Sequence, residues 1–267
     1  MQFHAARSLA TNFDFVPVTG STNTDLVASA IAAPSEYPDF SVLATGSQTA
    51  GRGRAGRDWV APAGSSLAVS VLLRPTIQPE QLGWLPLLAG LAMANTVADF
   101  LPTATVTLKW PNDVLVGEHK ISGVLSELLP DLSGVVVGAG VNLTQSLNEL
   151  PIPTATSLAI EEASAFADAK GQELSLVLTA YLTELKRLYT EFVAAGCDAT
   201  ASGLRDQIIA SCGTIGRLVR VILPAQQELI GKALTIENTG RLVIATDGTG
   251  ELTAVAAGDI IHLRLAI

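Results

Sequence analysis

The sequence holds few residues of the kinds that build metal centres, disulfide frameworks or membrane spans. It has two cysteines, Cys197 and Cys212, and three histidines, and neither set has the spacing of a metal site. No basic stretch followed by an apolar run stands at the N-terminus, and no segment is apolar for long enough to span a bilayer. We expect a cytoplasmic protein with reduced thiols and no membrane contact, while the ligands of any metal stay unknown.

Positive charge is scarce as well. Lysine and arginine number 16 against 25 aspartates and glutamates, so the net charge is −9. A chain of this charge is not expected to bind nucleic acid or an anionic membrane by general attraction. With 267 residues, 48% of them hydrophobic, it can bury the core of a large domain, or of a large and a small one. An anionic ligand must therefore be attracted by a local group of cations.

Residues 51–57, Gly-Arg-Gly-Arg-Ala-Gly-Arg, form such a group. Glycines bring backbone N–H groups against a ligand, and arginines add planar cations that match carboxylate or phosphate. Trp59 follows and can cover a bound group. Because the loop has no anchor except its ends, we expect it to be mobile when empty. We interpret it as a small-molecule anion site.

Two other interpretations of this loop are weaker. Its glycines satisfy the dinucleotide pattern G-x-G-x-x-G, but residues 48–50 separate them from the preceding strand, and Pro62 and Gly64 prevent a helix after them. A basic nucleic-acid-binding loop would stand alone in an acidic chain.

A polar stretch, Ser-Thr-Asn at residues 21–23, begins a predicted helix at residues 23–33. Thr22 and Asp25 fit a capping box, and Pro34 ends the helix. From these residues alone, capping is the favoured role. The alternative is that the same side chains face a ligand.

Hydrophobic periodicity predicts a large first part and a smaller second part. In the first part, strands are expected at residues 40–45, 66–73, 103–109, 114–116, 120–129 and 135–141, with helices at 82–101 and 174–195. The strands from 103 to 141 predict an antiparallel meander. Short strands at 219–223, 233–237, 242–246 and 260–265 predict a small β-barrel. We therefore expect one domain at residues 1–212 and another at 213–267.

Lys109 and Lys120 lie at strand ends beside a predicted turn at residues 110–113. The residues alone leave open whether these lysines are solvated or functional. Gly138 and Gly140, inside a strand, predict that a ligand or another backbone approaches closely. No nucleophile–histidine pair accompanies the cations. Such a set suits the activation of a carboxylate with ATP, in which positioning and charge neutralisation carry most of the catalysis.

Four stretches of the sequence resemble the bacterial biotin protein ligases. They are residues 21–23, 48–59, 109–113 with 120–124, and 138–142, which appear in the family's order and with similar spacing. The resemblance extends from about residue 19 to residues 257–264. It implies an α+β fold class, with a mixed β-sheet flanked by helices, as in a biotin/lipoate ligase-like catalytic domain, and a small C-terminal SH3-like β-barrel.

The resemblance also implies a two-step activity. Biotin and Mg-ATP give biotinyl-5′-AMP and pyrophosphate, and a lysine of the biotin carboxyl carrier domain of a biotin-dependent carboxylase then attacks the mixed anhydride. ATP, Mg²⁺ and biotin are thus the implied small molecules. Two alternatives stay open: a lipoate-type protein ligase, and a non-enzymatic biotin-binding module.

Roles for single residues follow from the same resemblance. The implied biotin-binding residues are Ser21, Thr22, Asn23, Gln48, Gly51, Arg52, Gly53, Arg54, Lys120 and Gly123. The implied nucleotide-binding residues are Arg54, Arg57, Trp59, Lys109, Asn112 and Asn142. The implied catalytic residues are Arg57, Lys109, Asp113 and Lys120. Two anions must be brought together in this reaction, and cations offset their repulsion.

The sequence departs from the family at two points. Ala55 stands where the family often has arginine, so the loop holds one fewer charge. Only about twenty residues precede Ser21, too few for the helix-turn-helix domain of family members that double as repressors. We expect a ligase-only form that does not bind DNA and that is a monomer or a weak homodimer.

Overall fold

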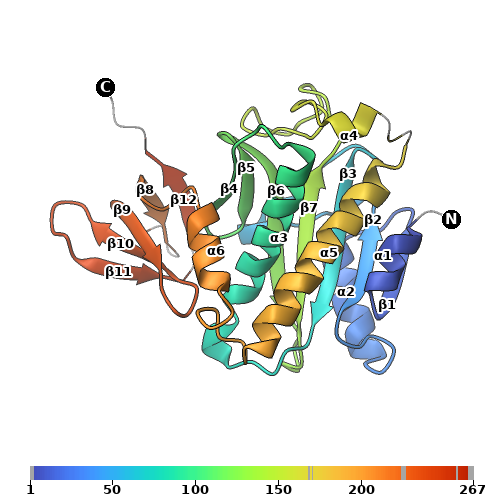
Figure 1. Cartoon of the computed structure of the whole chain (residues 1–267), viewed down its shortest axis with the longest axis horizontal. Helices are drawn as coiled ribbons and strands as arrows, with labels where there is room; N and C mark the ends of the chain where they lie inside the picture. Colours follow the sequence, from blue (N-terminus) through green and yellow to red (C-terminus); the bar gives the residue numbers. More distant parts are fainter. Residues whose placement is uncertain (1–2, 168, 170, 224–226, 257, 264–267) are drawn as a thin grey trace.

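The computed structural model describes residues 3–167, 169, 171–223, 227–256 and 258–263. Within them the chain builds a seven-stranded sheet with helices on its faces and then a separate five-stranded sheet (Figure 1). None of the described helices is both long and apolar enough to cross a membrane.

The seven-stranded sheet has the order β1-β2-β3-β7-β6-β5-β4. Its strands are β1 (Asn12–Val16), β2 (Ser41–Thr45), β3 (Ser66–Leu73), β4 (Val106–Lys109), β5 (Asp113–Val116), β6 (His119–Leu128) and β7 (Val135–Asn142). The pair β1–β2 is parallel and the other neighbours are antiparallel. The expected mixed sheet is confirmed, and so is the antiparallel meander, which comprises β4 to β7.

Helices cover both faces of this sheet. The described helices are α1 (His4–Leu9), α2 (Thr22–Ala32), α3 (Trp84–Phe100), α4 (Ser164–Ala167), α5 (Glu173–Ala194) and α6 (Leu204–Ser211). On β3, Val71 and Leu73 join the core beneath α3 and α5, while Leu72 between them packs with Leu26 and Ala30 of α2. Alternate side chains of a strand point to opposite faces, so the continuous apolar run of β3 follows from burial on both faces. The short helices α1 and α6 were not predicted.

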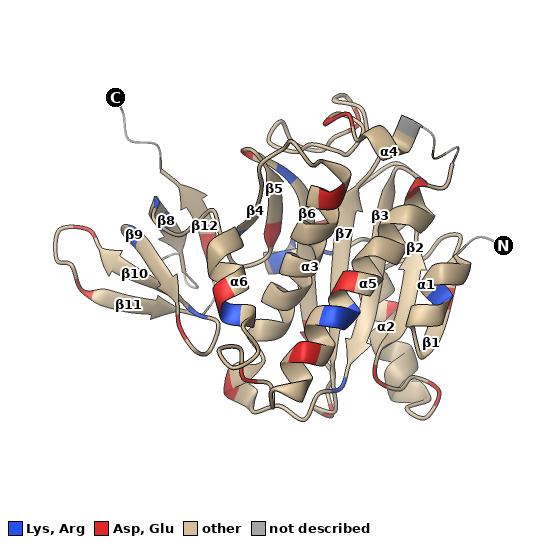
Figure 2. Cartoon of the chain, viewed as in Figure 1, with Lys and Arg blue, Asp and Glu red and all other residues tan. Residues whose placement is uncertain are grey.

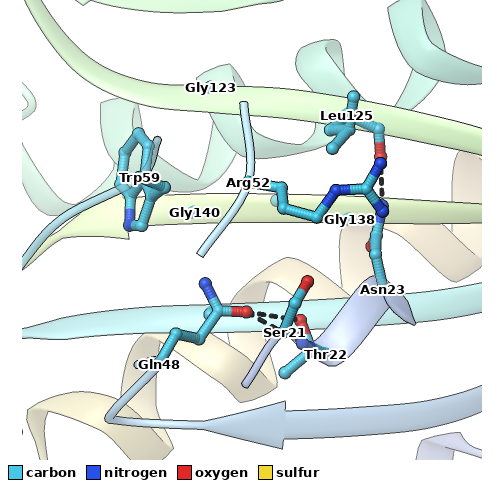
Figure 3. A pocket seen from close by; sticks show the side chains of 12 residues that line it. Ser21, Thr22, Asn23, Gln48, Arg52, Trp59, Gly123, Leu125, Gly138 and Gly140 are labelled. Carbon is cyan, nitrogen blue, oxygen red and sulfur yellow. Dashed lines mark hydrogen bonds between the residues drawn. The ribbon is translucent and has the colours of Figure 1, made fainter. Parts of the chain in front are cut away.

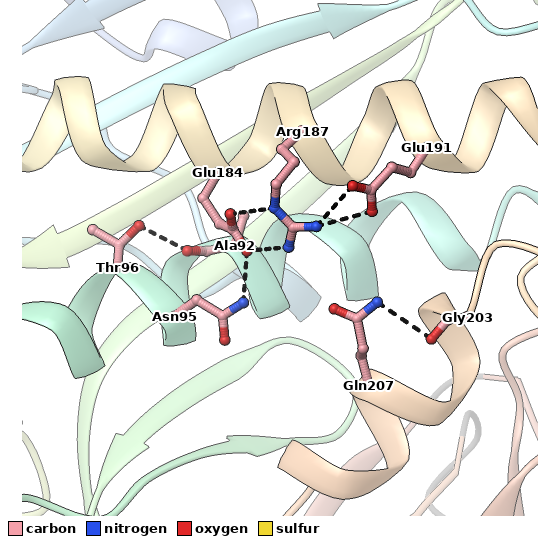
Figure 4. A network of polar contacts seen from close by, with 8 residues as sticks. All are labelled: Ala92, Asn95, Thr96, Glu184, Arg187, Glu191, Gly203 and Gln207. Carbon is pink, nitrogen blue, oxygen red and sulfur yellow. Dashed lines mark hydrogen bonds and ion pairs between the residues drawn. The ribbon is translucent and has the colours of Figure 1, made fainter.

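The helices α3 and α5 lie side by side across one face of the sheet (Figure 1). Twelve of the 17 residues of α3 are buried, which explains why its sequence is apolar all round rather than amphipathic. Asn95 of α3 donates a hydrogen bond from Nδ2 to Glu184 Oε1 of α5 at 2.7 Å, beside the exposed Arg187 (Figure 4). The two helices are thus joined by a polar contact as well as by the core.

The second sheet is antiparallel, with the order β11-β10-β9-β8-β12. Its strands are β8 (Leu218–Ile222), β9 (Glu228–Ile236), β10 (Leu242–Thr246), β11 (Leu252–Val255) and β12 (Asp259–His262). The expected C-terminal β unit is confirmed, but β11 was missed because this four-residue edge strand buries only Val255. Part of the strand expected at 260–265 lies outside the described residues, as do Ala257 and Arg264 of the resemblance.

Two indole groups join the first sheet and its helices to the second. Trp84 Nε1 donates to the Asn238 carbonyl at 2.9 Å, and Trp110 Nε1 donates to the Gly240 carbonyl at 3.1 Å. Both tryptophans are almost fully buried. The turn between β9 and β10 therefore packs against the start of α3. The domain boundary that we propose between residues 212 and 213 stays a prediction.

Replacing Trp84 by Phe removes one of these donors and leaves the Asn238 carbonyl without its partner. A buried acceptor left unsatisfied costs about 1–3 kcal/mol. We expect the free energy of unfolding, measured by urea denaturation, to fall by about that amount. Val193→Ala, on the exposed side of α5, is the control and should stay within about 0.5 kcal/mol of the wild type. Equal stability of Trp84→Phe and the wild type would contradict this account.

Candidate active site

The glycine–arginine loop folds back on itself as a short hairpin. Trp59 N donates to the Gly51 carbonyl at 2.9 Å, and Gly53 N donates to the Arg57 carbonyl at 2.6 Å. A 3₁₀ turn at Arg54–Gly56 forms the tip, so no helix begins at the last glycine. The prediction that no helix follows the last glycine of this loop is confirmed.

Ala55, at the tip of the hairpin, has a φ of 54°. This left-handed conformation is unfavourable for a residue with a Cβ atom, by about 1–2 kcal/mol. Gly56, with a φ of 72°, adopts the next left-handed position without that cost. The departure from the family at Ala55 thus leaves an uncharged, exposed turn between two arginines.

Each arginine of the loop contacts an acceptor on a different element. The contacts are Arg52 Nη1 to Glu127 Oε1 of β6 at 2.6 Å, Arg54 Nη1 to Asn112 Oδ1 at 3.0 Å, and Arg57 Nη2 to Asp259 Oδ1 of β12 at 2.8 Å. The expectation that the loop is anchored only at its ends is therefore wrong. The charges of the arginines hold the hairpin against three neighbours that are distant in sequence.

The loop covers two cavities that share part of their lining. The inner cavity lies among α2, β6 and β7 (Figure 3) and is lined by Ser21, Thr22, Asn23, Gln48, Arg52, Trp59, Ala68, Gly123, Leu125, Gly138, Ala139 and Gly140. The outer cavity, of about 420 Å³, is lined chiefly by Arg52, Gly53, Arg54, Arg57, Trp59, Asn112, Lys120, Gly123, Asn142 and Ile152. The structure thus brings a polar chamber and a cationic chamber together under one loop.

A hydrogen-bond network sets the polar wall of the inner cavity. Gln48 Oε1 accepts from Thr22 N at 2.8 Å and from the Thr22 hydroxyl at 3.2 Å. Ser70 Oγ lies 2.7 Å from Thr22 Oγ1 and donates to Asn23 Oδ1 at 2.6 Å. Asn23 Nδ2 donates to the Leu125 carbonyl at 3.0 Å. These bonds fix the side chains at the start of α2 in one orientation toward the cavity (Figure 3).

The favoured interpretation of residues 21–23 as a helix cap is wrong. The N-cap residue is Ser21, and its side chain makes no capping hydrogen bond. Asp25, the expected partner in the capping box, accepts instead from the Thr19 hydroxyl. Because Gln48 satisfies the backbone N–H of Thr22, the polar side chains are free to line the cavity.

Two glycines of β7 form the floor beneath these side chains. A Cβ atom at Gly138 would overlap Asn23 Oδ1, and one at Gly140 would lie 2.6 Å from Trp59 Cε2. The prediction was that a ligand or another backbone approaches these glycines, and the structure instead places two side chains, those of Asn23 and Trp59, against them. Trp59 Nε1 is buried and has no hydrogen-bond partner among the described residues, so a donor is available here for a ligand.

The two lysines occupy different positions. Lys120 lines the outer cavity, and its Nζ lies 2.6 Å from Asp113 Oδ1 on β5. Lys109 lines neither cavity. Burial lowers the pKa of the Lys109 amine, and the nearby ammonium of Lys120 lowers it further, while the Asp113 carboxylate raises it. The charges of Lys109, Lys120 and Asp113 therefore influence one another.

Most of the expected site residues come together. Gly51, Lys109 and Asp113 are the ones that line neither cavity. Gly51 has a structural reason to be glycine, because a Cβ atom there would overlap the Trp59 carbonyl. Asn142 uses both ends of its amide inside the protein, donating to the Thr156 carbonyl at 2.8 Å and accepting from Gln145 Nε2 at 3.0 Å.

Sequence reasoning missed three residues that complete the site. Ser70 is a buried polar residue inside the apolar run of β3, and that contrast was a usable signal. Glu127 and Asp259 are charged residues of strands, and nothing in their local sequence marks them. Their pairing with Arg52 and Arg57 becomes visible only in three dimensions.

Comparison with known proteins agrees with this geometry. Residues 15–142 match the Biotin/lipoate A/B protein ligase family, and residues 214–263 match the biotin protein ligase C terminal domain. The biotin--[acetyl-CoA-carboxylase] ligase of Mycobacterium tuberculosis is 39% identical over 254 residues, which cover 94% of this chain and 89% of that protein. The chain belongs to the biotin protein ligase family.

Other members of the biotin protein ligase family are more distant. The bifunctional ligase/repressor BirA of Escherichia coli is 29% identical over 204 residues, which cover 75% of this chain and 60% of that protein. Among solved structures, the biotin protein ligase from Aquifex aeolicus in complex with biotin and ATP has a TM-score of 0.75 and 25% identity, and the match covers 96% of this chain and 100% of that one.

Replacing Gly138 by Ala tests the floor of the inner cavity. The added methyl group would overlap Asn23, so Asn23 must leave its bonds to Ser70 and Leu125. Such overpacking costs about 1–3 kcal/mol, and we expect that loss in the free energy of unfolding, together with an altered NMR signal of the Asn23 side-chain amide. The control is Gly20→Ala, because a Cβ atom at Gly20 meets nothing within 4 Å. If both variants match the wild type, the floor does not need glycine.

Proposed function

We propose that this protein is a biotin–protein ligase. It activates biotin with ATP as biotinyl-5′-AMP and transfers the biotinyl group to a lysine of the biotin carboxyl carrier domain of a biotin-dependent carboxylase. The observation that carries the proposal is the pairing of a polar chamber with a cationic one beneath a single loop. The polar chamber suits a ring that carries hydrogen-bonding groups. The cationic chamber suits a carboxylate and a nucleoside triphosphate, which are both anions.

In the proposed complex, the inner cavity takes the ring of biotin. The ureido group of that ring has one carbonyl acceptor and two N–H donors. Ser21, Thr22, Asn23 and Gln48 present hydroxyl and amide groups that supply both kinds of partner. The backbone of Gly51–Arg54 lies over the tail of biotin, and Gly123 leaves room beside it, since a Cβ atom there would lie 3.1 Å from Lys120 Nζ.

The outer cavity then holds the reacting groups. A carboxylate oxygen of biotin attacks the α-phosphorus of ATP, a new C–O–P bond forms, and the bond from that phosphorus to the pyrophosphate oxygen breaks. Arg54, Arg57 and Lys120 line this space and offset the repulsion between the two anions. Trp59, Asn112 and Asn142 border the nucleotide, and Lys109 adds its charge from behind.

Asp113 acts here by orienting Lys120. An ammonium group has three donors, so Lys120 can keep its contact with Asp113 at 2.6 Å and still donate to the biotin carboxylate and the α-phosphate.

After adenylation, the amine of the acceptor lysine attacks the carbonyl carbon of biotinyl-5′-AMP. An amide bond forms and AMP leaves with the electron pair of the broken C–O bond.

Mg²⁺ enters this proposal with ATP. Magnesium takes most of its ligands from phosphates and water, and no group of three or more His, Cys, Asp or Glu among the described residues could hold a metal ion. When bound, the ion neutralises part of the triphosphate charge. The absence of DNA binding and the monomeric or weakly dimeric state stay predictions.

Pyrophosphate release tests the proposed function directly. With biotin and Mg-ATP, we expect pyrophosphate to form and a carrier domain to become labelled on one lysine, as seen by mass spectrometry. A lipoate ligase would instead release pyrophosphate with lipoate, and excess lipoate would compete with biotin. A non-enzymatic biotin-binding module would bind biotin by calorimetry without consuming ATP.

Replacing Lys120 by Ala should impair adenylate formation in particular. Losing one partner of a charge pair in a closed site costs about 2–5 kcal/mol, which corresponds to a rate loss of roughly 30- to 5,000-fold. Presynthesised biotinyl-AMP should partly restore carrier labelling, because the second step brings no two anions together. Lys232→Ala, exposed on β9, is the control. Wild-type adenylation by Lys120→Ala would exclude Lys120 from the first step.

A further inference from the structure

The side chain of Arg52 lies across the inner cavity. Figure 3 shows it reaching from the loop toward Asn23 and Leu125. Its Nη1 lies 2.6 Å from Glu127 Oε1 on β6 and 3.3 Å from Thr24 Oγ1 on α2. The guanidinium thus fastens the first arm of the loop to β6 and to α2.

We propose that Arg52 and Glu127 form a latch that retains biotin in the inner cavity. Glu127 is then a positioning residue, which acts through Arg52 and does not touch the substrate. This inference rests on the proposed function, and it adds a residue outside the lining of either cavity. It concerns the release of biotin and not the chemical step.

The carboxylate of Glu127 depends on the positive charge of Arg52 to offset the cost of its partial burial. The side chain of Glu127 is only 23% exposed, and its second oxygen, Oε2, is buried without a hydrogen-bond partner among the described residues. The guanidinium of Arg52 is the ion-pair partner that the structure gives this carboxylate. A partly buried carboxylate is costly without a cation, so the closed position of Arg52 is favoured.

Arg52 also differs from the other two arginines of the loop. Arg54 and Arg57 line only the outer cavity, where Arg54 contacts a neutral amide and Arg57 contacts a carboxylate whose side chain is 42% exposed. Arg52 lines both cavities, and the carboxylate of Glu127, outside the lining of either one, offsets its charge. Arg52 therefore serves mainly to close the inner cavity, and it attracts an anionic ligand less than Arg54 and Arg57 do.

The latch predicts separate effects on binding and chemistry. Arg52 lines the inner cavity, so a ring that this side chain retains there cannot leave until Arg52 swings away, and that movement breaks the pair with Glu127. Lys120 and Arg57 have their own partners, Asp113 and Asp259, and are not attached to Glu127. Weakening the latch should thus speed the release of biotin without slowing adenylation at saturation.

The test uses Glu127→Gln in the full chain, because Gln keeps the shape and the acceptor but removes the charge. A preformed complex with biotin is chased with an excess of unlabelled biotin, and the dissociation rate is measured with radiolabelled biotin. A partly exposed ion pair supports an increase of up to about five-fold. Single-turnover adenylate formation at saturating biotin and ATP should stay within about two-fold of the wild type.

The control is Glu191→Gln on α5. Glu191 Oε2 lies 2.9 Å from Arg187 Nη1, in an ion pair remote from both cavities (Figure 4). Glu191→Gln removes one negative charge, as Glu127→Gln does, and should leave the rate of biotin release unchanged. The double variant Arg52→Gln with Glu127→Gln should release biotin no faster than Arg52→Gln alone, because both changes break one contact.

The possible failures are distinguishable. If the wild type does not bind biotin, the proposed function fails whatever Glu127 does. If the wild type binds biotin and Glu127→Gln releases it at the wild-type rate, the latch proposal alone is wrong. It is also wrong if the effects of the two substitutions add, or if Glu127→Gln slows adenylation as much as it speeds release.

Discussion

Mutual repulsion among cations is the constraint on which the site depends. Arg52, Arg57 and Lys120 converge under one loop in a chain whose net charge is −9. Cations held this close destabilise one another unless carboxylates offset them. Each has such a partner, at 2.6–2.8 Å, and the three partners come from β6, β12 and β5. The acidic character of the chain is thus used locally to assemble a cationic site.

The second sheet supplies part of this compensation and is attached to the first sheet close to the site. The second sheet contributes Asp259 to the loop, and its β9–β10 turn accepts hydrogen bonds from Trp84 and Trp110. Trp110 directly follows Lys109, so the turn after Lys109 is held by the second sheet as well. The smaller sheet is therefore part of the scaffold of the site, although none of its described residues lines the inner or the outer cavity.

Local patterns were sufficient to predict most of the fold. β3 and the meander were correctly identified because runs of β-branched and apolar residues are bounded by turn residues, and α3 was identified because it is long and apolar. Short elements such as α1 and β11 have too few buried residues to show a hydrophobic periodicity in the sequence. The resemblance to biotin protein ligases is confirmed, and it rested on polar motifs that the fold alone does not require.

The site was less predictable than the fold, for a physical reason. A motif such as residues 51–57 shows which groups are present, but not which acceptors hold them. Thr22 had a plausible local role as a cap, and a residue 26 positions away, Gln48, took its N–H instead. Glu127 and Asp259 carry no local signal because a charged residue on a strand is usually solvated. Long-range pairing decided each of these outcomes.

The ion pair between Arg57 and Asp259 spans 202 positions of the sequence. A ribosome adding about 5–20 residues per second needs roughly 10–40 s to deliver the second member of the pair after the first. During that interval the seven-stranded sheet can already be complete, since its last strand ends at Asn142. The loop then exists on a nearly finished scaffold while one of its acceptors has not been synthesised. The nascent chain therefore acquires its cationic pocket in stages, and this ion pair forms only once the C-terminal sheet has been made.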